Sequence, residues 1–164
     1  MKRNLILFVL ISIIFITGCA TVNSEQSTNE PDWVSQMPQS ATYYYSVASQ
    51  TGESPSESLS GAQEKANLQI TTWMEGRIRD HLQDYSKENK QILDQETLDS
   101  TTAELKSEIK QIAMKDTTLV DKFISKDSKV WVLACYPVKK LDKSFPIFEQ
   151  EFDNNYVKKQ AKNF

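Results

Sequence analysis

Residues that build metal sites and phosphate-binding loops are scarce in this chain. Its 164 residues include a single histidine, His81, and two cysteines, Cys19 and Cys135. A structural zinc site needs about four histidine, cysteine or carboxylate ligands at suitable spacing, and this set cannot supply the usual combinations. The few glycines are also far apart: they are Gly18, Gly52, Gly61 and Gly76. The sequence therefore predicts neither a zinc site nor a glycine-rich loop that cradles a phosphate.

Long apolar runs are lacking too, except for one near the N-terminus. Lys2 and Arg3 precede this run, which covers residues 5–16. It is shorter than the roughly 20 residues that a membrane-spanning helix needs. A basic start, a short apolar segment and small residues before a cleavage point are typical of a secretory signal peptide. The sequence therefore predicts a signal peptide over residues 1–18.

The end of this run, Ile16-Thr17-Gly18-Cys19, resembles the lipobox of bacterial lipoproteins. In those proteins the cysteine sulfur carries a diacylglycerol, and the chain is cleaved just before the cysteine. The resemblance implies cleavage between Gly18 and Cys19, with a diacylglycerol and an N-acyl chain on Cys19; no other cofactor is expected. An uncleaved signal anchor and a plain secretory signal are the alternatives.

Basic residues are not in excess. The formal net charge is -3, and the loss of residues 1–18, which include Lys2 and Arg3, moves it to -5. An acidic chain is not expected to bind nucleic acid or to adhere electrostatically to anionic lipid headgroups. We therefore expect attachment to a membrane through acyl chains, in which each buried CH₂ contributes about 0.8 kcal/mol.

The second cysteine has no partner in the sequence. If Cys19 carries lipid, Cys135 is the remaining thiol and no intrachain disulfide can form. Cys135 lies inside an apolar run, residues 130–136. Free cysteine in such a setting commonly behaves as a small buried hydrophobe, and we favour this interpretation over a reactive or metal-binding thiol.

Composition divides the mature chain into two parts. Residues 19–30 are polar after the cysteine and are expected to form a flexible tether. As a random coil, such a segment spans roughly 15–20 Å. Residues 31–164 are expected to form a single α+β domain. It opens with Pro31-Asp32-Trp33, and the indole of Trp33 is expected to be buried.

The first elements of this domain are expected to be a strand and two helices. Residues 41–49 are rich in aromatic and β-favouring side chains and predict the strand. Ser54 begins a capping box, with Pro55 at the first helical position and Glu57 three residues after the cap. Apolar residues at steps of three and four then predict a helix that ends or bends near residues 87–90, followed by a second helix. The two apolar stripes comprise Leu59, Ala62, Ala66, Ile70, Trp73 or Met74, Ile78, Leu82 and Tyr85, and then Leu98, Thr102, Leu105, Ile109 and Ile112.

The C-terminal part predicts a hairpin and a last helix. Residues 117–124 and 129–138 are β-favouring, and Asp127-Ser128 between them predicts a turn that makes the pair antiparallel. The second run is almost wholly apolar and is expected to be the central strand, ended by Pro137. A helix then begins around residues 144–146, with an aromatic face of Phe145, Phe148, Phe152 and Tyr156. The predicted fold is α+β: a small antiparallel sheet of three strands in β-α-α-β-β-α order, with helices packed against it.

Four segments in this order resemble one family. They are Pro31-Asp32-Trp33, Tyr45-Ser46-Val47-Ala48, Ala62-Gln63-Glu64-Lys65-Ala66 and Val130-Trp131-Val132-Leu133-Ala134. Over residues 31–140 the chain is similar to the LPP-twenty lipoprotein family, named for a twenty-kilodalton antigenic lipoprotein, and to its relatives among flagellar accessory proteins. The resemblance implies an outer-membrane or cell-surface lipoprotein with an α+β domain and no established catalytic centre. Some relatives take part in flagellar or envelope assembly, and Ala20, in place of aspartate, is the residue type that favours outer-membrane sorting.

Side chains with catalytic potential are few. His81 lies among charged residues of the first predicted helix and is expected to face solvent; a general base or ligand is the alternative. The neighbouring carboxylates are expected to lie on solvated helix faces rather than to form the paired acids of a glycosidase. These pairs are Glu149 and Glu151, Asp94 and Glu96, and Glu104 and Glu108. We therefore expect no catalytic residue and no enzymatic activity.

The triplet Tyr43-Tyr44-Tyr45 is the most unusual feature of the first predicted strand. Alternation along a strand sends Tyr44 to one face of the sheet and Tyr43 with Tyr45 to the other. Outward tyrosines offer a large contact area with a polar handle, so Tyr43 and Tyr45 are the candidate ligand or partner contacts. The alternative is that helices cover this face and bury both rings in the core.

These observations support three hypotheses about function. The first is a non-enzymatic lipoprotein of the outer membrane, whose tethered domain binds another envelope or flagellar component, or itself. The second is a binding module for peptidoglycan, another glycan or a small ligand, acting through the strand tyrosines. The third is a regulator that contacts a cell-wall synthesis enzyme through acidic helix surfaces.

Overall fold

The computed structural model describes residues 30–91 and 95–162. The predicted signal peptide, the cleavage site at Gly18 and Cys19, nearly all of the tether, and Asp94 lie outside these residues. The described elements are α2 (Asp32–Ser35), β1 (Tyr43–Gln50), α3 (Pro55–Glu88), α4 (Gln95–Asp116), β2 (Thr118–Ile124), β3 (Val130–Pro137), α5 (Val138–Asp142) and α6 (Phe145–Lys162). The three strands form one antiparallel sheet with helices packed against it, so the predicted α+β fold is confirmed.

The sheet has the strand order β1-β3-β2, which confirms that the apolar run in β3 is the central strand. Cys135 at its middle pairs with Tyr45 on one side and with Thr118 on the other. The predicted turn joins β2 to β3. There Ser128 adopts a positive φ of 61° and donates its backbone N–H to the Ser125 carbonyl (3.0 Å).

The long helix α3 begins at the predicted cap. Ser54 Oγ accepts a hydrogen bond from the backbone N–H of Glu57 (3.2 Å), and Pro55 stands in the first turn. The Glu57 carboxylate in turn accepts from the backbone N–H of Glu53 (2.9 Å) rather than from that of Ser54. The cap therefore satisfies the orphan N–H of Glu57, whereas the reciprocal bond of a capping box is displaced by one residue and holds the chain before the helix.

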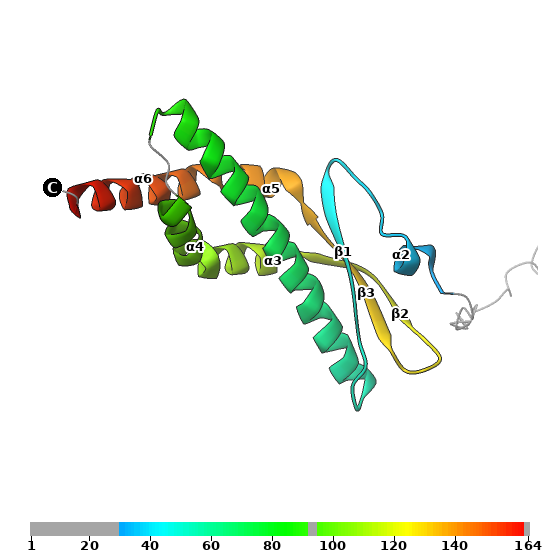
Figure 1. The fold of residues 1–164 in the computed structure, drawn as a ribbon. Helices are drawn as coiled ribbons and strands as arrows, with labels where there is room; N and C mark the ends of the chain where they lie inside the picture. The colour runs from blue at the N-terminus through cyan, green and yellow to red at the C-terminus, as the bar shows by residue number, and fades with distance from the viewer. Residues whose placement is uncertain (1–29, 92–94, 163–164) are drawn as a thin grey trace, which may run out of the picture.

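The first half of α3 crosses one face of the sheet (Figure 1). Ala62 and Ala66 are fully buried there, and Ser46 Oγ on β1 donates a hydrogen bond to the Ala66 carbonyl (3.1 Å). Such a contact between a strand side chain and a helix backbone requires the small residues that the sequence places at this end of the stripe. Larger stripe residues follow toward the C-terminal half, where Met74, Ile78 and Leu82 are fully buried.

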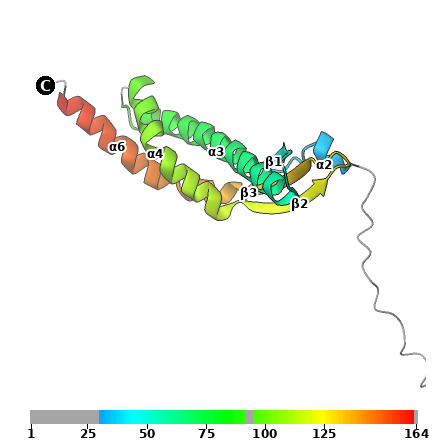
Figure 2. The ribbon, with the colours of Figure 1, turned by 90° about the horizontal axis from the view of Figure 1, so that it is seen from below.

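Beyond the sheet, the second half of α3 packs against α4 and α6. In both views the sheet and α2 form one end of the molecule, and the C-terminal end of α6 lies at the other (Figures 1 and 2). The predicted aromatic face of α6 is confirmed at Phe148 and Phe152, which are fully buried, whereas Phe145 and Tyr156 are half-buried. One hydrophobic core thus runs from the sheet into the helical end.

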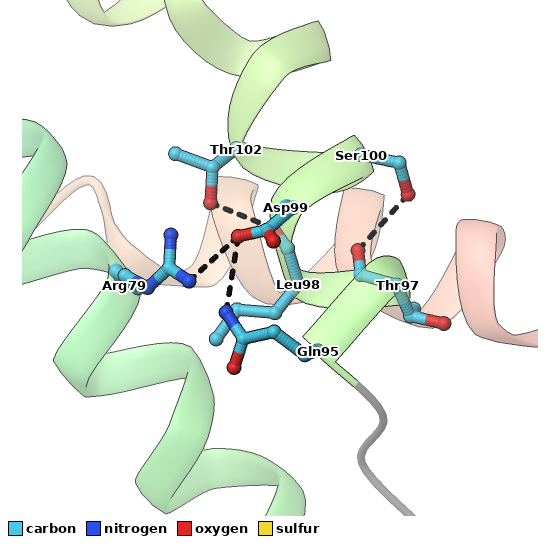
Figure 3. A network of polar contacts seen from close by, with 7 residues as sticks. All are labelled: Arg79, Gln95, Thr97, Leu98, Asp99, Ser100 and Thr102. Atoms are coloured by element: carbon cyan, nitrogen blue, oxygen red, sulfur yellow. Dashed lines mark hydrogen bonds and ion pairs between the residues drawn. The ribbon is translucent and has the colours of Figure 1, made fainter.

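The contact between α3 and α4 corrects one detail of the predicted stripe. Thr101 is fully buried, whereas Thr102, the expected stripe residue, is half-exposed and donates its hydroxyl to the Leu98 carbonyl (2.8 Å). Arg79 on α3 pairs with Asp99 on α4 (2.6 Å) in the polar network of Figure 3. Both charged side chains are well exposed, so we ascribe little stability to this pair.

Two features near the sheet were not predicted. Trp33 was expected to be buried, but it is only partly buried, on the short helix α2. The short helix α5 begins directly after Pro137 and buries Leu141. A helix this short carries too few residues for a periodic apolar pattern, and its burial depends on the neighbouring core.

Candidate functional site

The two faces of β1 carry different aromatic contacts. Tyr44 points toward α3 and stacks on the indole of Trp73, with ring centroids 4.4 Å apart and an interplanar angle of 5°. Trp73 in turn lies 6.2 Å from the ring of the fully buried Tyr136. Tyr44 therefore belongs to the core beneath α3, as the alternation predicts.

Tyr43 and Tyr45 lie on the opposite face. Their ring centroids are 6.4 Å apart with the planes tilted by 47°. Tyr43 is 42% exposed, and Tyr45 is half-buried. The alternative that helices bury both rings in the core is therefore wrong for Tyr43. The two rings form a neighbouring pair that solvent reaches from the Tyr43 side.

The remainder of this face is partly covered by the N-terminal segment. Asp121 on β2 pairs with Leu133 on β3, so both side chains lie on the face away from α3. The indole N–H of Trp33 donates to the Asp121 carboxylate (3.0 Å), which places α2 over this face. Leu133 is 4% exposed and thus well covered.

Cys135 shares this face with Tyr45, its partner in the register. The thiol is buried, and burial raises its pKa, because the thiolate would lose its hydration. A nucleophilic cysteine needs the opposite environment, one that lowers the pKa. The interpretation of Cys135 as a small buried hydrophobe fits this setting.

Two hollows flank the sheet on the side of α3. One, of about 550 Å³, follows the outer edge of β1 and is largely apolar; its lining residues are Met37, Tyr44, Val47, Leu68, Gln69, Thr72 and Trp73. The other, of about 270 Å³, lies between α3 and β2 and is lined by Gln63, Asn67, Met114, Thr117, Leu119, Val132 and Ala134. Neither lining includes a carboxylate, a histidine or a cysteine, so neither hollow resembles the site of an acid-base enzyme.

His81 does not face solvent as expected. Its imidazole Nε2 lies 2.7 Å from Glu149 Oε1, and its ring stacks on Phe145 at a centroid distance of 3.9 Å. Both contacts join α3 to α6, and both polar side chains are less than a third exposed. The sequence separation of 68 residues left no local signal for this pairing. The histidine therefore takes part in helix packing.

A second polar contact joins the same helices one turn further along. Tyr85 donates its hydroxyl to Asp153 (2.8 Å), and the amide of Gln91 donates to the other carboxylate oxygen (2.8 Å). The hydrogen bond to Asp153, together with burial, raises the pKa of Tyr85 to about 12. This cluster also serves packing, because its carboxylate accepts from two neutral donors and faces neither hollow.

The carboxylates noted in the sequence are distributed along the helices. Glu149 contacts His81, Glu96 pairs with Lys159 on α6 (2.8 Å), and Glu104 accepts from Asn155 (2.8 Å). Among the described residues, no group of three or more histidine, cysteine or acidic side chains lies close enough to hold a metal ion. The helices of these described residues also lack the combination of length and apolar composition that a membrane span requires.

A scan against family models and searches of curated proteins and solved structures find no match to this chain. Function is therefore inferred from its residues and their geometry.

Proposed function

We propose that this chain is a non-enzymatic lipoprotein of the bacterial outer membrane, related to the LPP-twenty family. Acyl chains on Cys19 hold its α+β domain at the membrane, where the domain contacts an envelope or flagellar component. The observation that carries this proposal is the sequence Ile16-Thr17-Gly18-Cys19 after a short apolar run. Tethering acts by raising the effective concentration of the domain for a weak second contact.

The geometry of the domain supports a role in binding rather than catalysis. The side chains most able to act as a base, nucleophile or acid are engaged in packing or buried; they are His81, Cys135 and Asp153. Accessible features that could contact a partner include the Tyr43 ring, the outer edge of β1 and the hollow between α3 and β2.

Metabolic labelling with palmitate tests the anchor. Wild-type chain and a Cys135→Ser control are expected to incorporate label, because Cys135 is buried and distant from the N-terminus, whereas Cys19→Ser is expected to incorporate none. Mass spectrometry of the N-terminal peptide should then show an acylated Cys19 as the first residue. An unlabelled wild type, or a mature chain that begins elsewhere, would show that the anchor is wrong.

The exposure of Tyr43 favours a second candidate, a glycan-binding surface formed by Tyr43 and Tyr45. The full chain should then co-sediment with purified peptidoglycan sacculi. Tyr43→Ala should lose this binding, while Tyr43→Phe, which keeps the ring, should retain most of it. Failure of the wild type to co-sediment would exclude this candidate and leave the anchored binding domain in place.

A further inference from the structure

The outer edge of β1 lacks the features that normally protect an edge strand. β1 is the terminal strand of the sheet, and no other described strand pairs with its outer side. Its sequence, YYYSVASQ, contains no charged residue and no proline. The other edge strand, β2, is interrupted by a bulge between Leu119 and Asp121 and carries charge at Asp121 and Lys122. Bulges and charges of this kind discourage the addition of a further strand, and β1 has neither.

The hydrogen bonds at the two ends of β1 show which backbone groups point outward. The Thr42 carbonyl accepts from the Val138 N–H (3.0 Å), in register with the pairing of β1 and β3. Backbone groups of a strand alternate between its two sides, so the even-numbered residues of β1 bond to β3. The groups of Tyr43, Tyr45, Val47 and Ser49 therefore point to the outer edge. In agreement, the Ser49 carbonyl accepts from Lys65 Nζ (3.3 Å).

Two of these outward groups are already engaged. The Tyr43 N–H donates to Ser40 Oγ (3.3 Å), and the Ser49 carbonyl is held by Lys65. The outward groups left over are the Tyr43 carbonyl, both groups of Tyr45 and of Val47, and the Ser49 N–H. This set is self-complementary in one antiparallel register. When Tyr45 faces Val47 and Tyr43 faces Ser49, every group left over finds a partner of the opposite kind in a second copy. In this register the engaged Tyr43 N–H of one copy would face the engaged Ser49 carbonyl of the other. Their existing hydrogen bonds therefore leave no other edge group without a partner.

We propose that two copies of this chain pair antiparallel through their β1 edges, with Tyr45 of each facing Val47 of the other, to form one continuous sheet. The absence of charge along β1 means that two identical strands meet without like-charge repulsion. Beside the paired edge, Leu68 on α3 is 64% exposed and Met37 is 37% exposed. Both line the apolar hollow along β1 and supply the hydrophobic contact that strand pairing alone lacks.

The symmetry of this pairing allows both copies to be anchored in the same membrane. In this one respect the inference rests on the proposed function. Antiparallel edges in a continuous sheet are related by a twofold axis perpendicular to the sheet. Both copies of α3 then lie on one face, and both copies of α2 lie on the other, where Trp33 contacts Asp121. The two α2 helices, which are the first described elements after the predicted tether, therefore lie on the same face of the dimer. Two anchored copies in one bilayer meet at high effective concentration.

A charge placed on the edge tests the dimer. The full mature chain, purified in detergent, is expected to sediment as a dimer. Val47→Lys should raise the dimer dissociation constant at least about tenfold, because the two lysines would lie diagonally across the paired strands on the same face and repel each other. Val120→Lys places the same charge on the exposed opposite edge and should leave the dimer intact. A monomeric wild type, or a Val47→Lys chain that dimerises as well as wild type, would overturn the proposal.

Disulfide trapping tests the register and does not depend on the stability of the lysine variant. All chains carry Cys135→Ala, because Cys135 lies opposite Tyr45 within one copy. Residues facing each other across antiparallel strands are close enough for a disulfide, whereas diagonal neighbours lie about 7–8 Å apart, beyond the usual limit. Co-expressed Tyr45→Cys and Val47→Cys chains, oxidised in intact cells, should therefore form a crosslinked dimer, and each variant alone should not.

A Tyr45→Cys chain that crosslinks alone would refute this register, and no crosslink in the mixture would refute the dimer. Palmitate labelling reports on the anchor separately, so the two proposals can fail independently.

Discussion

The Tyr44 ring lies parallel to the indole of Trp73, joining the edge strand β1 to the middle of α3. A stacked aromatic pair contributes about 0.5–1.5 kcal/mol beyond the area it buries. A double-mutant cycle of Tyr44→Leu and Trp73→Leu should therefore give a coupling free energy of this size in chemical denaturation. Additive effects of the two substitutions would show that the stack contributes nothing beyond burial.

The contact between His81 and Glu149 should contribute measurably to the packing of α6. Glu149→Ala leaves the partly buried imidazole without its partner and should lower the free energy of unfolding by about 1–2 kcal/mol. The exposed pair of Asp84 and Lys87 is the matched control. Asp84→Ala should change stability by less than about 0.5 kcal/mol. Equal effects at the two sites would contradict the role assigned to His81.

Two tyrosines should respond oppositely to the loss of their hydroxyl groups. The Tyr136 hydroxyl is buried and has no hydrogen-bond partner among the described residues, whereas that of Tyr85 donates to Asp153. Tyr136→Phe should raise the free energy of unfolding by about 1 kcal/mol, and Tyr85→Phe should lower it by a similar amount. Thermal unfolding of both variants beside wild type measures the difference, and a destabilised Tyr136→Phe would indicate that its hydroxyl is satisfied by water.

Stability should also fall at alkaline pH. The pKa of Tyr85 is raised to about 12 by its bond to Asp153, and burial raises that of Tyr136 to about 12. Both pKa values in the folded state exceed the unfolded value. The contribution of the protonated hydroxyl groups to the free energy of unfolding is therefore complete below about pH 10 and is lost as pH rises toward about 12. In the double variant Tyr85→Phe and Tyr136→Phe, the free energy of unfolding should fall less between about pH 9 and about pH 11 than in the wild type, as measured by chemical denaturation. Parallel curves for wild type and variant would contradict this.

Glycines inside α3 should differ in their tolerance of a methyl group. A Cβ at Gly76 would meet nothing within 4 Å, whereas one at Gly61 would lie 2.9 Å from Gln50 Cγ. Gly76→Ala should stabilise the protein by about 0.5–1 kcal/mol through helix propensity. Gly61→Ala should gain less, because the Gln50 side chain must move. A larger gain at Gly61 than at Gly76 would show that Gln50 rearranges without cost.

Local features of the fold could be predicted because their causes are local. The cap at Ser54, the stripe of α3 and the turn before β3 depend on hydrogen bonds and periodicity within a few residues. The central position of β3 was also predictable, since an almost wholly apolar run indicates a strand that is covered on at least one side.

Long-range contacts account for what could not be predicted. His81 stands among charged residues, yet Glu149 and Phe145 of α6 draw it into the packing. Trp33 is exposed more than its size suggests, because the segment that carries it covers only part of the sheet. Thr101 is buried instead of Thr102, and Asn155 of α6 donates to its hydroxyl (3.3 Å), a contact between distant segments that a helical stripe does not specify.

The amino-acid sequence alone determined the candidate anchor at Cys19 and the alternation of the three tyrosines, because a cleavage motif and a strand period are written in neighbouring residues. The tertiary structure alone decided that Tyr44 meets Trp73, that Tyr43 stays exposed, and that β1 lies at an edge. The order of the strands depends on which distant segments pair with each other. That pairing depends in turn on burial of the sheet against α3, and no short stretch of sequence specifies it.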